Sequence, residues 1–288
     1  MSSPQKVFPG TLRDAADRGR KIAMVTAYDA PSARLADRAG VDAILVGDSA
    51  AMAVLGLDST VGVTMDEMLV LTRAVSRGAR RPLLVADLPF GAYQVSNRDA
   101  VKNAIRFVRD AGADAIKVEG AGTTIRRAAA IVAAGVPVMG HLGLTPQTAT
   151  MLGGYHPQGR TATSATRLLE DARTLETAGC LAVVLEAVPA EVAARVTDAL
   201  RIPTIGIGSG AHCDGQVLVW HDLLGLTAGH LPRFVKQYAQ LGDQIVAAIE
   251  AYVADVRAAT FPGDAHTYRM FSGELPVFQD AINERSDT

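Results

Sequence analysis

Cysteine, aromatic residues and clustered charge are all scarce in this sequence. Of its 288 residues, two are cysteines and 5% are Phe, Trp or Tyr. Cys180 and Cys213 lack the spacing of a metal site, so free thiols in a reducing compartment are favoured, with one disulfide as the alternative. The 28 basic and 30 acidic residues contain no Lys/Arg block, which argues against binding to nucleic acid or to an anionic membrane.

Long hydrophobic runs are missing as well. No stretch approaches the length of a membrane span, and the first 21 residues contain no apolar segment of the kind found in signal peptides. We therefore expect a cytoplasmic protein. Apolar residues still make up 49% of the chain, and the abundance of Ala and Gly suits helices packed closely on a sheet.

Short apolar runs alternate with helical patterns along the chain. The runs are rich in Val, Ile and Leu and too short for helices, so they predict buried parallel strands. They lie at 22–28, 43–48, 83–87, 115–119, 137–141, 182–186, 203–208 and 216–222. This order predicts an α/β fold, a single-domain (β/α)8 TIM barrel. An open doubly wound sheet is the alternative, but no G-x-G-x-x-G follows the first run.

The domain organisation follows from the same pattern. We expect an N-terminal segment with a short helix at 1–20, the barrel at 21–262 and a polar, irregular tail at 263–288. The longest helical pattern runs from 232 to about 260. Glycines at helix ends predict turns into the next strand: Gly40, Gly78, Gly112, Gly135 and Gly179.

Two helix starts are marked by capping residues. Thr64 and Glu67 form a T-x-x-E capping box, and Ser96 precedes a second helix. In that second helix one face carries Val101, Ala104, Ile105 and Val108. We expect this face to pack against the sheet.

Four of the apolar runs end on a carboxylate: Asp48, Asp87, Glu119 and Glu186. Because parallel strands point the same way, these acids should gather at one edge of the sheet. Crowded acids repel one another and raise each other's pKa unless positive charge lies among them. The pattern therefore predicts a metal ion, a cationic substrate or a catalytic acid–base pair at this edge.

Asp48, Asp87 and Glu119 end three neighbouring strands, which lie roughly 4.8 Å apart in a sheet. Three carboxylates at that spacing can share one hard divalent cation, and Mg²⁺ is the natural candidate for oxygen ligands. The alternative for any single acid is that it caps the next helix or faces solvent. Three of them on successive strands favour a shared site.

Other charged residues lie near the same edge. Lys117 precedes Glu119 by two residues and shares its face of the strand, so it could pair with an acid or grip a substrate oxygen. Glu186 lies across the barrel mouth in an apolar setting and is better suited to acting as a base, or it caps the helix near Pro189. His141 could contact substrate, although a core histidine is the first interpretation.

A larger set of ordered motifs resembles one known family. They include 24-MVTAYD-29, 46-VGDS-49, 87-DLPF-90, 117-KVEG-120, 140-GHLGLTPQ-147, 185-LE-186, 205-IGIGSG-210 and 261-FPG-263. Together they closely resemble the ketopantoate (3-methyl-2-oxobutanoate) hydroxymethyltransferases, (β/α)8 barrels of the phosphoenolpyruvate/pyruvate superfamily. The resemblance runs from about Thr11 to His266.

The resemblance implies an activity and roles for these residues. It implies Mg²⁺ at Asp48, Asp87 and Glu119, and 2-oxo acid contacts from Asp48, Ser49, Asp87 and Lys117. Glu186 would take the C3 proton. A Mg²⁺-stabilised enolate of 3-methyl-2-oxobutanoate would then attack the one-carbon unit of 5,10-methylenetetrahydrofolate, giving 2-dehydropantoate for pantothenate and coenzyme A synthesis. The family forms homo-oligomers, often decamers.

Two positions depart from the family pattern. Leu57 stands where His or Tyr is common, and Ser209 stands where Ala is usual. Both are expected at the barrel mouth, and neither coincides with a metal or base position; folate affinity is the property that Leu57 puts in doubt. Two other functions remain open: a Mg²⁺-dependent C–C lyase or aldolase acting on another 2-oxo acid, and a non-catalytic barrel.

Overall fold

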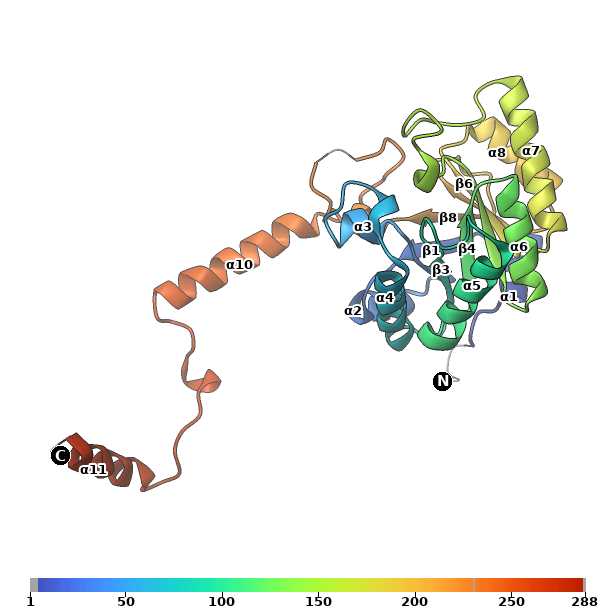
Figure 1. The fold of residues 1–288 in the computed structure, drawn as a ribbon. Helices are drawn as coiled ribbons and strands as arrows, with labels where there is room; N and C mark the ends of the chain where they lie inside the picture. Colours follow the sequence, from blue (N-terminus) through green and yellow to red (C-terminus); the bar gives the residue numbers. More distant parts are fainter. Residues whose placement is uncertain (1–4, 230, 287–288) are drawn as a thin grey trace. The chain divides into compact units, whose positions relative to one another are not determined.

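Eight parallel strands close into a barrel in which each strand pairs with its neighbours in sequence and β8 pairs with β1 (Figure 1). The closed order of the strands confirms the predicted (β/α)8 fold. The computed structural model describes residues 5–229 and 231–286. The strands are β1 (Ile22–Thr26), β2 (Ala43–Val46), β3 (Leu83–Asp87), β4 (Ala115–Glu119), β5 (Val138–Gly143), β6 (Ala182–Glu186), β7 (Thr204–Ile207) and β8 (Gly215–Leu218).

Alternation along the strands separates the barrel interior from the layer under the helices. In β3 the interior cluster contains Leu83 and Val85, whereas Leu84 and Ala86 pack with the helices. Because side chains alternate with period two, the next interior position in β3 is Asp87. The same parity puts Lys117 and Glu119 of β4 in the interior, beyond Ala115. The apolar interior therefore ends in a layer of charged groups at the carboxyl ends of the strands.

Helices surround the strands, and a short helix belongs to the interior cluster. Leu12 and Ala15 of α1 (Pro9–Asp17) are buried with Ile22 and Met24 of β1. The outer helices are α2 (Ala30–Ala39), α4 (Met65–Gly78), α5 (Asn97–Ala111), α6 (Thr123–Ala133), α7 (Ala162–Thr177) and α8 (Ala190–Ala199). Short helices α3 (Ala50–Ala53) and α9 (Trp220–Leu223) follow β2 and β8. Single 3-10 turns lie at η1 (Thr60–Gly62) and η2 (Pro146–Thr148).

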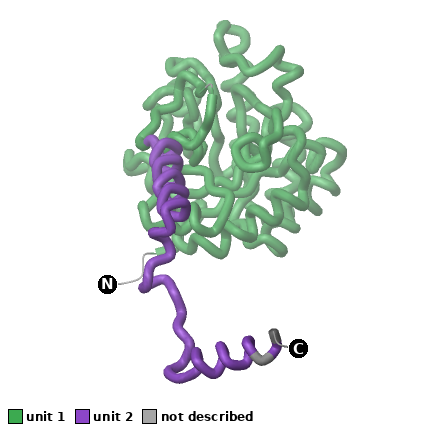
Figure 2. The backbone as a smooth tube through the Cα atoms, turned by 90° about the vertical axis from the view of Figure 1, so that its left-hand side faces the viewer, with its two compact units in different colours: residues 1–239 green, residues 240–288 purple. Residues whose placement is uncertain are grey.

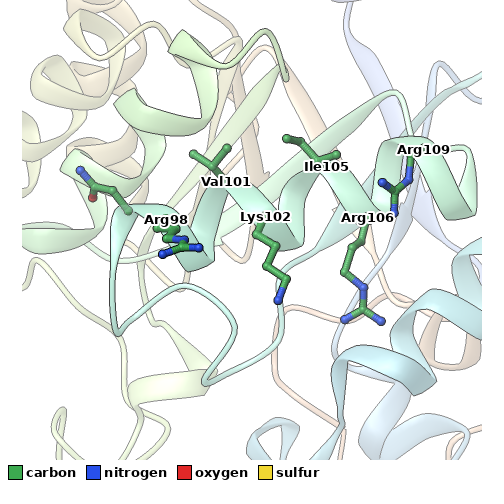
Figure 3. A pocket seen from close by; sticks show the side chains of 7 residues that line it. Arg98, Val101, Lys102, Ile105, Arg106 and Arg109 are labelled. Atoms are coloured by element: carbon green, nitrogen blue, oxygen red, sulfur yellow. The ribbon is translucent and has the colours of Figure 1, made fainter.

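The face of α5 that packs on the barrel agrees with the prediction at Ala104 and, in part, at Val101, and differs from it at the other two residues. Its buried residues are Ala100, Ala104, Phe107 and Ala111, whereas Ile105 and Val108 are exposed. The buried face therefore combines three small alanines with one large side chain, Phe107. The outer face, from Asn97 to Arg109, lines a shallow cavity of about 850 Å³ on the helix surface (Figure 3).

The predicted helix ends are right at most of the glycines and wrong at one. Gly40 and Gly112 adopt the left-handed C-cap conformation, while Gly78 is the last residue of α4. A Cβ at Gly78 would lie 2.3 Å from the Ala30 carbonyl oxygen of α2. Gly78 is therefore required for the close contact of α2 with α4. Both predicted caps are present: Thr64 accepts from Glu67 N, and Ser96 accepts from Asp99 N.

The described chain divides into two compact units, residues 1–239 and 240–288 (Figure 2). The second unit contains α10 (Leu241–Arg257), a 3-10 turn η3 (Asp264–His266) and α11 (Glu274–Ser286). The predicted helix from 232 is shorter, and the tail expected to be irregular contains α11. In the first unit β8 ends at Leu218, because α9 begins at Trp220. Among the described residues, no helix combines the length and apolarity needed to cross a membrane.

We predict that Gly78→Ala lowers stability by about 1–3 kcal/mol, because its methyl group would overlap backbone atoms of α2. Thermal unfolding of the variant should show a lower midpoint. Gly10→Ala in α1 is the matched control, since a Cβ there meets nothing within 4 Å and Ala is the better helix former. Equal midpoints for the two variants would contradict the close-contact role of Gly78.

Candidate active site

A buried ion pair joins two adjacent strands at the charged end of the barrel. Asp87 of β3 and Lys117 of β4 are direct register partners, and Lys117 Nζ lies 2.6 Å from Asp87 Oδ1. Their side chains are 2% and 5% exposed, so the two charges have lost most of their water. Burial alone would lower the pKa of the Lys117 ammonium, but the neighbouring carboxylates of Asp87, Glu119 and Asp48 raise it.

Asp48 lies two residues beyond the end of β2 and reaches the same cluster. Its backbone N donates to Asp87 Oδ2 at 3.0 Å, which holds the turn after β2 against β3. Burial, together with the negative charges of Glu119 and Asp87, raises the pKa of the Asp48 carboxyl well above its usual range. The shift reflects burial first and the two neighbouring carboxylates second.

His141 connects Glu119 with Glu186. Glu119 and His141 are register partners on β4 and β5, and His141 Nδ1 lies 3.2 Å from Glu119 Oε1. On its other side, His141 Nε2 lies 3.3 Å from Glu186 Oε2. The predicted base therefore belongs to the same constellation as the other acids, but one imidazole separates it from Glu119.

The charges of His141 and Glu119 stabilise each other. Burial alone would lower the pKa of His141, but the Glu119 carboxylate and contacts with Glu119 and Glu186 raise it to about 9. Burial alone would raise the pKa of Glu119, but His141 and Lys117 lower it. At neutral pH this pair is therefore charged. The imidazolium hydrogen-bonds Glu119 through Nδ1, whereas Nε2 lies 3.3 Å from Glu186 Oε2 without forming a hydrogen bond.

Gln147, which the strand-end pattern missed, bridges two of the acids. Its Nε2 donates to Asp48 Oδ2 at 2.9 Å and to the Leu88 carbonyl at 3.0 Å, and its backbone N donates to Glu119 Oε2 at 3.1 Å. Tyr93 donates to Gln147 Oε1 at 2.7 Å, which fixes the amide orientation. Gln147 lies in η2 after β5, so a search that included the loops beyond each strand end would have found it.

Ser49 does not cap the helix that follows it. It occupies the N-cap position of α3 without a side-chain capping bond. Its hydroxyl instead lies 2.8 Å from the Tyr28 hydroxyl, and the Tyr28 ring packs 5.5 Å from the His221 ring, between centroids. Ser49 therefore lies at the barrel mouth beside Asp48, where a substrate contact was predicted. Tyr28 and His221 were not predicted there.

A backbone hydrogen bond and a contact between its carboxylate and His141 fix the position of Glu186. Its side chain is 16% exposed, and α8 has no side-chain cap, so Glu186 does not cap that helix. The carbonyl of Glu186 accepts from Leu144 N at 2.8 Å. A Cβ at its register partner Gly143 would lie 2.2 Å from this carbonyl, so the ends of β5 and β6 approach as closely as glycine permits.

The donor set fits a hard cation. Asp48, Asp87 and Glu119 are buried oxygen donors, and Lys117 is a permanent cation between them. In residues 5–229 and 231–286, no three His, Cys, Asp or Glu side chains converge on a point where they could hold a metal. Mg²⁺ commonly takes one or two carboxylates and keeps several waters. Asp48 and Asp87 are the nearest pair to consider, because the backbone N of Asp48 donates to the Asp87 carboxylate. Sharing of one ion by all three acids stays a prediction.

Comparison with protein families and curated proteins identifies close relatives. A family model described as ketopantoate hydroxymethyltransferase matches residues 6–264. A 3-methyl-2-oxobutanoate hydroxymethyltransferase of Moorella thermoacetica is 54% identical over 93% of this chain and 100% of its own length. One from Carboxydothermus hydrogenoformans is 52% identical over 92% of this chain and 96% of its own length.

Solved structures with the same fold are far more distant in sequence. A phosphonopyruvate hydrolase in complex with oxalate and Mg²⁺ matches with a TM-score of 0.59 at 15% identity, covering 97% of each chain. A 2,3-dimethylmalate lyase of the PEP mutase/isocitrate lyase superfamily matches with a TM-score of 0.58 at 18% identity, covering 99% of this chain and 98% of its own. These likenesses support the barrel fold alone.

We predict that Gln147→Met destabilises the protein by about 1–3 kcal/mol, because Asp48 and Tyr93 each lose a buried hydrogen-bond partner. Unfolding without added divalent metal measures the effect. Gln158→Met is the matched control, because Gln158 Nε2 donates to the nearby His156 carbonyl at an exposed site. An equal loss in both variants would show that Gln147 does not organise the acids.

Proposed function

The chain belongs to the ketopantoate hydroxymethyltransferase family, and we propose that the charged end of its barrel is the active site. Its activity is that of a 3-methyl-2-oxobutanoate hydroxymethyltransferase, an enzyme of pantothenate biosynthesis. The observation that carries the site assignment is that His141 links the buried acid cluster to Glu186, 3.3 Å away. The lyase alternative is not favoured, because the lyase likeness is only 18% identical.

In this proposal Asp48, Asp87 and Glu119 attend one Mg²⁺. The carboxylates of Glu119 and Asp87, which add to the effect of burial on the pKa of Asp48, favour a cation there, and all three side chains offer oxygen ligands. When bound, Mg²⁺ supplies Lewis-acid polarisation of the 2-oxo acid. Gln147 orients Asp48 and Glu119 towards the site, as partners of metal ligands commonly do.

Lys117 holds negative charge on the substrate. Its ammonium is already charged and buried beside Asp87, so it needs no rearrangement to attract the carboxylate or the developing enolate oxygen of 3-methyl-2-oxobutanoate. Asp48, Ser49, Asp87 and His141 complete the substrate contacts in this proposal. Ser49 is oriented by its hydrogen bond with Tyr28.

Glu186 takes the C3 proton. It is more exposed than the other three acids, so it can reach a substrate lying across the barrel mouth. The carbanion equivalent left at C3 forms the new C–C bond with the one-carbon unit of the co-substrate 5,10-methylenetetrahydrofolate. Water then releases tetrahydrofolate, leaving 2-dehydropantoate.

We also propose that the chain works as a homo-oligomer. Within the second unit, α10 leaves several large apolar side chains exposed: Ile245, Val246, Ile249 and Tyr252. A contiguous apolar face of this kind marks a protein–protein interface. The mass in solution tests the proposal, and a monomer at micromolar concentration would contradict it.

We predict that Glu186→Gln slows exchange of the C3 proton of 3-methyl-2-oxobutanoate with D₂O by about 10²–10⁴-fold, the usual contribution of a general base. Substrate binding should persist, since the amide keeps the shape of the side chain. Exchange is followed by NMR in the presence of Mg²⁺ and without folate. Glu191→Gln, on the exposed surface of α8, is the control; wild-type exchange in Glu186→Gln would exclude Glu186 as the base.

We predict that Asp87→Asn weakens Mg²⁺ binding by at least about tenfold, the smallest loss usual even for indirect partners of a metal site. Titration calorimetry with Mg²⁺ measures the affinity. Asp66→Asn serves as control, because the Asp66 side chain is 84% exposed. Unchanged affinity in the Asp87 variant would remove Asp87 from the metal site.

A further inference from the structure

The turn that carries Glu186 has an uncommon backbone. Ala187, directly after Glu186, has φ of +49°, in the left-handed region that residues with a Cβ rarely adopt. Its N donates to the Ile207 carbonyl at 2.9 Å, and its carbonyl accepts from Gln158 N at 3.0 Å. The chain therefore reverses sharply at the base, and the surrounding hydrogen bonds hold it there.

One side chain fastens both sides of this turn. Ser209, in the loop after β7, is fully buried. Its hydroxyl donates to the Leu185 carbonyl at 2.7 Å and accepts from Val188 N at 3.1 Å. The two partners flank Glu186 and Ala187, so a single hydroxyl spans the segment that aims the carboxylate.

Open space lies beside this turn. A cavity of about 950 Å³ borders the turn and is lined in part by Ala187, Val188 and Pro189. Without the Ser209 hydroxyl, Leu185 O and Val188 N would lose their partner in a buried place. Ala187, the left-handed residue between them, could then relax to a more favourable backbone conformation, because the cavity leaves space beside it.

We propose that Ser209 is a positioning residue for proton abstraction: its hydroxyl fixes the turn after β6 so that Glu186 faces substrate and His141. Ser209 itself touches no reacting atom. The sequence placed Ser209 near the barrel mouth but away from the base position; in space it is bonded to the backbone on both sides of the base. This inference rests on the proposed role of Glu186, and it concerns this chain in particular, because the Ala that is usual at this position in the family carries no hydroxyl.

The test is C3 proton exchange without folate in Ser209→Ala. A displacement of about 1 Å at a catalytic group can cost about 10²-fold, so we expect exchange to slow by about tenfold to 100-fold. The Mg²⁺ affinity and the KM for 3-methyl-2-oxobutanoate should stay within about twofold of wild type, because the metal and substrate contacts lie on other strands. Ser209→Cys should recover part of the rate, since a thiol is a weak donor and acceptor of similar size.

A double-mutant cycle separates positioning from general destabilisation. In the Glu186→Gln background, Ser209→Ala should slow exchange no further, because the group that it positions is gone. Thr72→Val is the matched control, a buried hydroxyl whose bond to the Met68 carbonyl lies within α4. It should lower stability without changing exchange.

Three outcomes would contradict the inference, and each would do so in a different way. Wild-type exchange in Ser209→Ala, with exchange lost in Glu186→Gln, would overturn the positioning role alone. Wild-type exchange in Glu186→Gln would overturn the proposed base and this inference with it. Equal rate losses in Ser209→Ala and Thr72→Val would also overturn the inference, because they would reflect destabilisation only.

Discussion

The buried ion pair between Lys117 and Asp87 is the interaction on which the charged end of the barrel depends. Three carboxylates lie together with little water, and an arrangement of like charges is costly unless a cation lies among them. Lys117 supplies one positive charge at 2.6 Å from Asp87 and 3.7 Å from Glu119. His141 supplies a second beside Glu119. The pKa of Asp48 stays raised by burial and by the neighbouring acids even so, and the nearness of three oxygen donors is the reason to expect a cation among them.

At the same edge of the sheet, the imidazole of His141 lies between two acids to which we assign different roles, a metal ligand and a base. On one side of His141 lies Glu119, whose pKa is lowered by the imidazolium and Lys117 despite burial. On the other side lies Glu186, the more exposed of the two acids. Because the His141 ring lies between the two acids, Glu186 does not contact Glu119 directly and stays partly exposed. The Ser209 hydroxyl then holds the turn that keeps Glu186 in that place.

Strand periodicity in the sequence predicts the barrel and most of its charged end. The eight strands, their order and the meeting of Asp87, Lys117, Glu119, His141 and Glu186 all result from alternation and parallel direction. Periodicity does not predict Gln147, Tyr93 or the contacts of Ser209, because these depend on how loops fold back over strand ends. The predicted packing face of α5 was right at Ala104 and wrong at Ile105 and Val108, because the helix turns Phe107 towards the barrel instead. Such contacts join residues that are far apart in the chain, so the local sequence pattern does not predict them.

The position of the divalent ion decides whether the acids of β2, β3 and β4 form the metal site. Crystals grown with Mn²⁺ in place of Mg²⁺ and with 3-methyl-2-oxobutanoate would show the ion by its anomalous scattering. We expect one strong peak per chain within coordination distance of Asp48 or Asp87, with Glu186 making no bond to the ion. A peak on Glu186, or saturating Mn²⁺ bound away from the ends of β2, β3 and β4, would contradict it.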